Sequence, residues 1–192
     1  MRFRPQLRMS VTRRENKEQR LKEFIGQHLA TRQSSDAPPT RALLIVARSA
    51  ESPVIKAIAG LAGEIASLGA SVRMILAQPD REGLADGWTL AAEPAALDYE
   101  VRWARDPRLI EAHEQLVLGP QTCWVGDSMR REPAKCDAFE TYTPECSQAA
   151  HSATLSFERL WTASEPLLQR VNGVASQVVD AARDTTGPAS RH

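Results

Sequence analysis

Apolar residues over positions 42–77 follow a strand, helix, strand pattern. The run Ala42–Ala47 is continuously apolar, which is typical of a strand covered on both faces. Ser52-Pro53 suits a helix N-cap and first turn, and the helical spacing of the apolar residues that follow predicts a helix closed by Gly69. Val72–Ala77 predicts a second strand. These elements form a βαβ unit, so we expect parallel strands.

The pattern beyond this unit changes to shorter strands and a helix. Residues 78–97 are weakly patterned and predict a long loop. The remaining elements expected before residue 166 are a strand around Val101 and Trp103, a short helix over 107–112, an antiparallel hairpin of strands near 115–118 and 122–126, and a helix opened by Thr143-Pro144. Strands and helices thus alternate, which indicates an α/β protein.

Both ends of the chain carry helical patterns. Leu21, Phe24, Ile25 and Leu29 share one side of a helix expected from about 13 to 31, which we expect to dock on the rest of the protein. Apolar residues spaced through 166–183 predict a C-terminal amphipathic helix. The expected organisation is a basic N-terminal arm, helix and linker over 1–40, a compact domain over 41–165, the amphipathic helix over 166–183, and a disordered tail over 184–192.

Charge is unevenly distributed along a chain whose net charge is zero. Residues 1–32 hold nine lysines and arginines against three glutamates, a net charge of +6, so the remainder carries −6. A basic arm of this kind suits a phosphate-bearing partner, and it equally suits a solvated surface. No apolar run reaches the length of a membrane span, and no secretory signal is visible, so we expect a cytoplasmic protein.

The cysteines give no sign of a metal site or a disulfide framework. Cys123, Cys136 and Cys146 are odd in number and contain no CxxC pair, which indicates reduced thiols and no metal. The segment after Ala47 does not spell GxGxxG, and no GxxxxGK[ST] loop or GxSxG elbow is present, so we expect no cofactor.

Candidate chemistry lies between residues 113 and 161. His113-Glu114-Gln115 leads into an apolar strand, Trp124-Val125-Gly126-Asp127-Ser128 follows, and Glu140 and a helix with Phe157 and Trp161 come next. This order resembles a single copy of the phospholipase D-like (HKD) superfamily over about residues 41–165. That family's motif begins HxK, continues through an aspartate to GSxN, and is followed by a downstream glutamate.

The match to this motif is incomplete. His113 matches the histidine, Gly126 the glycine and Glu140 the downstream glutamate. Gln115 stands in place of the lysine and Pro120 in place of the aspartate, while Asp127 and Met129 replace the serine and asparagine. The resemblance implies a mixed sheet flanked by helices, and two motifs that meet across a homodimer, with one histidine attacking phosphorus and the other protonating the leaving oxygen.

The replaced residues weaken the expectation of catalysis. Gln115 brings no positive charge and Pro120 no carboxylate, and loss of one preorganised stabiliser commonly costs about 10²–10³ in rate. Arg130 and Arg131 could compensate, because an arginine fork binds phosphate and could form an anion pocket with His113 and Ser128. The alternatives are a surface loop whose arginines pair with nearby acids, and a partly buried, hydrogen-bonded His113. We expect Trp124, Trp161 and Cys123 to fill the core, and an exposed His151 without a role.

Three functions remain open from the sequence. The first is a non-catalytic phospholipase D-like domain that acts through binding or dimerisation, as a homodimer with a possible phosphate-bearing ligand. The second is a weak phosphodiesterase that uses His113 across a homodimer. The third is a nucleic-acid or anionic-surface binder that acts through residues 1–32.

Overall fold

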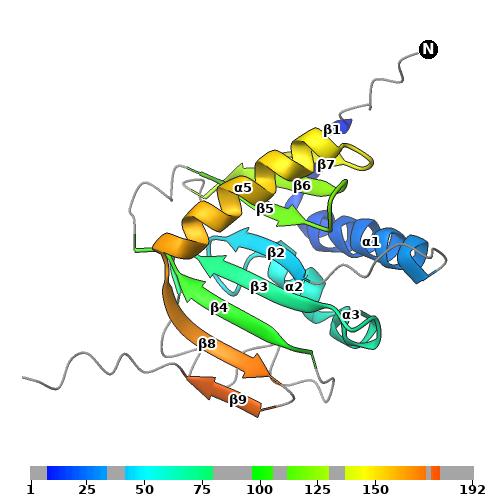
Figure 1. Ribbon diagram of the computed structural model, residues 1–192. Helices are drawn as coiled ribbons and strands as arrows, with labels where there is room; N and C mark the ends of the chain where they lie inside the picture. Colours follow the sequence, from blue (N-terminus) through cyan, green and yellow to red (C-terminus); the bar gives the residue numbers. More distant parts are fainter. Residues whose placement is uncertain are drawn as a thin grey trace, which may run out of the picture.

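A mixed sheet of nine strands forms the centre of the computed structural model, which describes residues 8–33, 42–79, 97–105, 112–129, 137–171 and 174–177 (Figure 1). The strands are β1 Arg8–Arg13, β2 Ala42–Ala47, β3 Ser71–Leu76, β4 Tyr99–Trp103, β5 His113–Val117, β6 Cys123–Ser128, β7 Asp137–Thr143, β8 Glu165–Val171 and β9 Val174–Gln177. Their order is β1-β7-β6-β5-β2-β3-β4-β8-β9. Strands β2, β3 and β4 are parallel, and the other pairings are antiparallel. The α/β fold class with a mixed sheet is confirmed.

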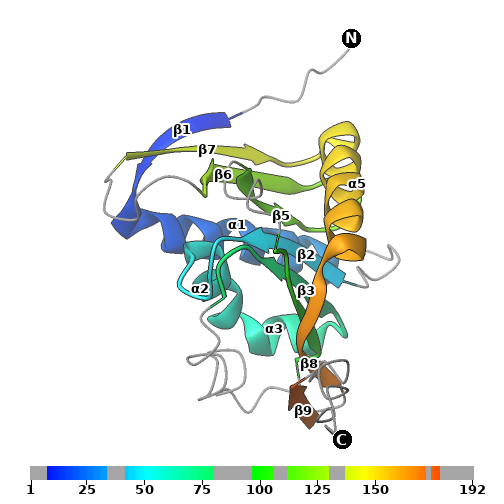
Figure 2. The ribbon, with the colours of Figure 1, turned by 90° about the vertical axis from the view of Figure 1, so that its left-hand side faces the viewer.

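Helices cover both faces of this sheet. The helices are α1 Arg14–Gln33, α2 Pro53–Ala59, α3 Ala62–Ser67 and α5 Ser147–Ala163. Figure 2 shows α1, α2 and α3 on one face and α5 on the other. Each face has its own apolar cluster, because side chains alternate along a strand. Leu43 and Ile45 of β2 point into the cluster under α1–α3, whereas Leu44 and Val46 point into the cluster under α5.

The predicted βαβ unit is confirmed, with one break in its helix. Strands β2 and β3 are parallel neighbours, with Ala42 opposite Ser71. The predicted single helix is two short ones, because the chain leaves helical geometry at Gly60-Leu61. A side chain at Gly60 would meet only the flexible end of the Lys22 side chain, which can move aside. Gly69 closes the segment with a positive φ of 66°.

The N-terminal helix docks as predicted. Leu21, Ile25 and Leu29 are buried in the core cluster of their face, and Phe24 packs against it. The sequence did not predict β1, which precedes α1 directly, or β7, with which β1 pairs in antiparallel register. Both strands lie toward one edge of the sheet.

The prediction of an amphipathic helix over 166–183 is wrong for residues 166–171 and 174–177, and its other residues lie outside the described part of the chain. Residues Glu165–Val171 and Val174–Gln177 are strands, and β8 extends the sheet beyond β4. Val171 pairs with Val174, and Asn172-Gly173 between them in the sequence is a composition typical of a two-residue hairpin turn. Pairing of β8 with β4 and with β9 prevails over the apolar spacing.

The remaining elements divide into confirmed predictions and those outside the described residues. Strand β4, the β5–β6 hairpin and α5 are confirmed. Trp124, Trp161 and Cys123 are buried, and His151 is exposed. Most of the loop over 78–97 and of the helix over 107–112, the linker up to residue 40 and the tail over 184–192 lie outside the described residues. None of the described helices is long and apolar enough to cross a membrane.

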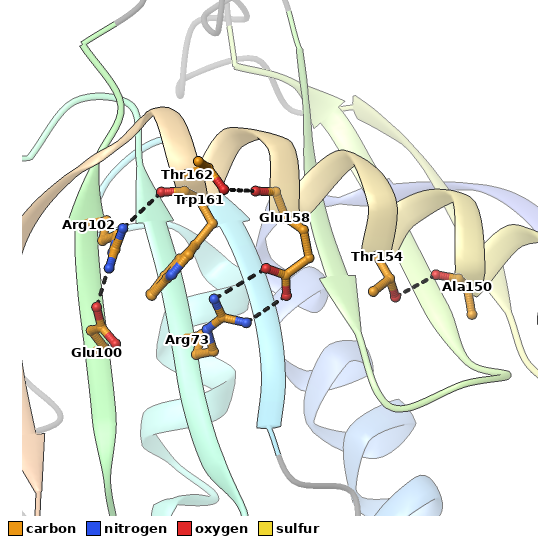
Figure 3. A network of polar contacts seen from close by, with 8 residues as sticks. All are labelled: Arg73, Glu100, Arg102, Ala150, Thr154, Glu158, Trp161 and Thr162. Atoms are coloured by element: carbon orange, nitrogen blue, oxygen red, sulfur yellow. Dashed lines mark hydrogen bonds and ion pairs between the residues drawn. The ribbon is translucent and has the colours of Figure 1, made fainter.

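Two arginines fasten the C-terminal end of α5 to β3 and β4 (Figure 3). Arg73 lies 4.1 Å from the centre of the Trp161 ring and donates to Glu158 at 2.6 Å. Arg102 lies 4.4 Å from the same ring and donates to the backbone oxygen of Trp161 at 3.0 Å. Cation–π stacking on a largely buried ring is stronger than an exposed ion pair, so Trp161 is the centre of this contact. These contacts of Arg73 and Arg102 determine where α5 crosses the sheet.

A half-buried histidine on α1, His28, makes stability depend on pH. Burial, and next the Arg32 guanidinium, lower the pKa of His28 from 6.5 to about 4. The unfolded chain therefore takes up this proton at a higher pH than the folded protein, so stability should fall between pH 6.5 and about 4. We expect roughly 1–3 kcal/mol of this loss to disappear in His28→Gln. Urea denaturation at several pH values measures it, with the exposed His151→Gln as control; identical pH profiles for both variants would refute it.

Candidate functional site

His113 begins β5, which lies inside the sheet between β6 and β2, and its side chain is exposed. Its ring Nδ1 lies 2.8 Å from the backbone oxygen of Gly126 on the neighbouring strand β6. A carbonyl oxygen can only accept, so Nδ1 carries the proton, and in the neutral ring Nε2 keeps its lone pair. One interpretation of the sequence was a partly buried, hydrogen-bonded His113. The ring is hydrogen-bonded, but it is exposed. The contact fixes both orientation and tautomer.

Gln115 follows His113 on the same strand. It pairs with Val125 of β6 on one side and with Val46 of β2 on the other. Leu116 belongs to the cluster under α1–α3 and Val117 to the cluster under α5, so alternation places Gln115 on the α5 face. Gln115 is partly buried there, and it supplies no charge.

Gly126 has a packing role of its own. A side chain at this position would collide with the indole ring of Trp124, which is fully buried. The strand therefore requires glycine here so that the indole can lie against the backbone. The same residue presents the carbonyl oxygen to His113.

Glu140 of β7 is completely buried and is held by two partners other than His113. Its Oε1 lies 3.5 Å from Lys17 Nζ, and its Oε2 accepts a hydrogen bond from the Tyr142 hydroxyl at 3.1 Å. The Lys17 ammonium, from α1, also lies 5.7 Å from the centre of the Trp124 ring. Burial, and next the Glu140 carboxylate, raise the pKa of Tyr142 above its usual value, so this hydroxyl stays protonated and donates.

The predicted residues after β6 are only partly described. Ser128 ends β6 and pairs in register with His113, so the backbone brings these two candidates together. Arg130 and Arg131 lie outside the described residues. Among the residues that the structure describes, no group of three His, Cys, Asp or Glu side chains could hold a metal ion.

A fixed turn next to His113 was not predicted from the sequence. Glu114 is largely buried, and its Oε1 accepts from the Ser52 hydroxyl at 2.5 Å and from the backbone N–H of Arg48 at 3.1 Å. The Ser49 backbone N–H donates to the same Ser52 hydroxyl oxygen at 3.2 Å. Glu114 therefore anchors the turn after β2 to β5. One sequence signal could have revealed this turn. It follows the carboxyl end of the buried parallel strand β2, where side chains of neighbouring strands meet.

Solved structures of known proteins share this arrangement of strands and helices. Nuc from Salmonella typhimurium, a phospholipase D family member, matches with a TM-score of 0.55 at 12% identity, over 86% of this chain and 100% of that one. The chain has a phospholipase D-like fold. NucT from Helicobacter pylori matches with a TM-score of 0.51 at 10% identity, over 84% of this chain and 100% of that one.

A third solved structure with this phospholipase D-like fold is that of TrmBL2, an archaeal chromatin protein whose structure shows a mode of DNA binding. It matches with a TM-score of 0.50 at 13% identity, over 83% of this chain and 54% of that one. No protein-family model and no curated protein matches the chain. Identities this low show the shared fold alone, so the expected fold is confirmed, and the site roles remain predictions.

We expect the buried Lys17–Glu140 pair to dominate the stability of this region. Lys17→Met leaves the fully buried Glu140 without its cation, which should cost about 3–5 kcal/mol. Adding Glu140→Gln should recover part of that loss, because it removes the uncompensated charge. Lys22→Met is the control, since Lys22 pairs with Glu18 near the surface of the same helix. Chemical denaturation measures all three; equal losses for the Lys17 and Lys22 variants would refute the assignment.

Proposed function

We propose that this protein is a non-catalytic phospholipase D-like domain that acts by binding a phosphate-bearing ligand. The observation that carries the proposal is the position of Glu140. In the family that the sequence resembles, a downstream glutamate belongs with the catalytic motif, whereas here it is buried in an ion pair with Lys17 and a hydrogen bond with Tyr142. A carboxylate held in this way stabilises the contact between α1 and β7.

Two further positions support binding rather than turnover. Gln115 can donate a hydrogen bond to a phosphate, but it cannot neutralise charge that develops during phosphoryl transfer. Pro120 lies exposed in the turn between β5 and β6, next to Gly119 with its positive φ of 88°, and has no carboxylate to orient a histidine. Binding needs only donors and positive charge, and the sequence offers Gln115 and Ser128 as donors and Arg130 and Arg131 as cations.

The ligand class follows from charge and from one structural neighbour. The exposed His113 at the start of β5 and the basic N-terminal segment both favour an anionic partner. TrmBL2 is described as a chromatin protein that binds DNA. A nucleic-acid backbone is therefore the ligand we propose, with a homodimer as the binding form.

A phosphodiesterase that uses His113 across a homodimer is the second candidate. One observation favours it: the hydrogen bond from Nδ1 to Gly126 gives a neutral His113 the tautomer that a nucleophilic Nε2 requires. The exposed ring therefore meets one requirement of a nucleophile, the correct tautomer. A direct test must distinguish the two candidates.

The third candidate places binding in residues 1–32. Leu21, Ile25 and Leu29 belong to the core, so deleting the whole segment would remove part of the fold. Removing residues 1–7, which include Arg2 and Arg4, is the informative truncation. Loss of oligonucleotide binding in that variant alone would assign binding to the N-terminal segment.

The decisive experiment is a phosphodiesterase assay with bis-p-nitrophenyl phosphate and single-stranded DNA. We expect neither the wild type nor His113→Ala to exceed buffer, because Gln115 and Pro120 cannot supply what the chemistry needs. His151→Ala, which removes an exposed histidine on α5, is the matched control. Turnover by the wild type and by His151→Ala, but not by His113→Ala, would contradict the proposal and establish the phosphodiesterase.

A further inference from the structure

Two cysteines lie together where the start of α5 meets strand β6. Cys123 begins β6, Cys146 is the N-cap residue of α5, and both are free thiols. We propose that they form a site of reversible oxidation, in which Cys146 reacts first with a small-molecule disulfide and Cys123 then closes an intramolecular disulfide. The pair lies at the far end of the β5–β6 hairpin from His113, because Cys123 pairs with Val117 whereas His113 pairs with Ser128. It is therefore separate from the candidate site described above.

Strand register and one backbone hydrogen bond bring the two cysteines to the same corner of the sheet. Cys123 is paired with Thr143, the last residue of β7. The chain then turns, with a positive φ of 55° at Glu145, and reaches Cys146. The Cys146 backbone N–H donates to the backbone oxygen of Gln121 at 2.6 Å. Since Gln121 comes just before β6, Cys146 is held against the start of the strand that carries Cys123.

The side chain of Cys123 lies on the face of the sheet that α5 covers. It belongs to the apolar cluster of that face, together with Ala150 and Ala153 of the helix. The Cys146 backbone oxygen accepts from the Ala150 N–H at 3.1 Å, so Cys146 begins the helical turn that packs on this cluster. Cys146 itself lies between the turn and the helix, where the backbone can adjust to the geometry that a disulfide requires.

The two thiols differ in exposure, and this difference sets the order of reaction. Cys146 is partly exposed, whereas Cys123 is only 2% exposed. Burial raises the pKa of the Cys123 thiol; a hydrogen bond with the Thr143 side chain lowers this pKa, and the nearby Cys146 thiol raises it. The thiolate is the attacking species, so a buried thiol with a raised pKa reacts slowly with a reagent from solution. Cys146 is thus the thiol that such a reagent meets first.

Oxidation by glutathione disulfide takes two thiol–disulfide exchange steps. The Cys146 thiolate attacks one sulfur of glutathione disulfide, the sulfur–sulfur bond of that molecule breaks, and one glutathione thiolate leaves. The Cys123 thiolate then attacks the Cys146 sulfur and releases the second glutathione thiolate. The two cysteines together lose two electrons, glutathione disulfide gains them, and the two thiol protons end on the released glutathione molecules. An excess of a reduced thiol reverses both steps.

The disulfide would tie the start of α5 to β6. It closes a loop that contains all of β7, which leads into α5 (Figure 2). The other end of α5 is already held by the contacts of Arg73 and Arg102 with Trp161. A cross-link of this kind restricts the unfolded chain, so we expect a higher urea midpoint for the oxidised protein than for the reduced protein.

The test uses the full chain with Cys136→Ser, because Cys136 lies outside the described residues and shares the tryptic peptide 136–159 with Cys146. This parent protein is incubated with glutathione disulfide in the absence of denaturant. Its intact mass should fall by the mass of two hydrogen atoms, and digestion should yield peptide 109–130 joined to peptide 136–159. Dithiothreitol should restore both thiols and the lower urea midpoint.

Two further variants of the parent protein test the order of reaction. Cys123→Ser should keep glutathione on Cys146 as a mixed disulfide, at least about tenfold more abundant than in the parent, because it lacks a neighbouring thiol at an effective concentration in the millimolar range. Cys146→Ser should take up little glutathione, since Cys123 is buried. Circular dichroism checks that both variants stay folded.

Four results would overturn the site. The first is a parent protein that keeps glutathione on Cys146 while Cys123 stays a free thiol. The second is a disulfide between two chains, seen as a dimer on a non-reducing gel. The third is an intramolecular cross-link that forms only in urea, which would mean that the folded chain keeps the two thiols apart. The fourth is a parent protein that does not react with glutathione disulfide.

Discussion

The buried ion pair between Lys17 and Glu140 is the interaction on which the rest of the structure depends. Two opposite charges, each almost completely removed from water, are stable only together, because either one alone would be a desolvated charge in a protein interior. The pair joins α1, near the start of the chain, to β7, and the Tyr142 hydroxyl satisfies the other carboxylate oxygen. It therefore fixes the position of α1 on its face of the sheet.

The buried pair influences the candidate site through strands β7 and β6. Strand β7 pairs with β6, and β6 carries Trp124, whose ring lies close to Lys17 on one side and requires glycine at position 126 on the other. Gly126 in turn holds His113. The glutamate thus contributes to placing the histidine through packing rather than by touching it. The exposed His113 ring is thus held by a strand whose packing depends on the buried pair.

The part of the fold that the sequence predicted best is the part with local signals. The apolar run Ala42–Ala47, the Ser52-Pro53 helix start and Gly69 each act within a few residues, and all agree with the structure. Residues after 165 show the opposite case. Apolar spacing there fits a helix, but the chain forms strands, since pairing of β8 with β4 and of β9 with β8 decides the outcome. Local spacing could not report a partner strand that lies far away in sequence.

In the candidate site, too, contacts within a local structure could be predicted and contacts between distant segments could not. His113 and Ser128 were identified from the sequence, and the hairpin brings them together, because a hairpin is a local structure. The bond of Glu114 to the Ser52 hydroxyl was missed, since it joins residues that are far apart in the sequence. The partnership of Glu140 with Lys17 was missed for the same reason. Single residues can suggest chemistry, but only the sheet determines which of them meet.

A crystal structure of the protein grown with pyrophosphate tests the central claim most directly. We expect the anion beside the exposed His113 ring of a single copy, with Glu140 still paired to Lys17 and Tyr142. An anion held between the His113 rings of two copies, with Glu140 turned to hydrogen-bond one of those rings, would contradict the account and point to a working phosphodiesterase.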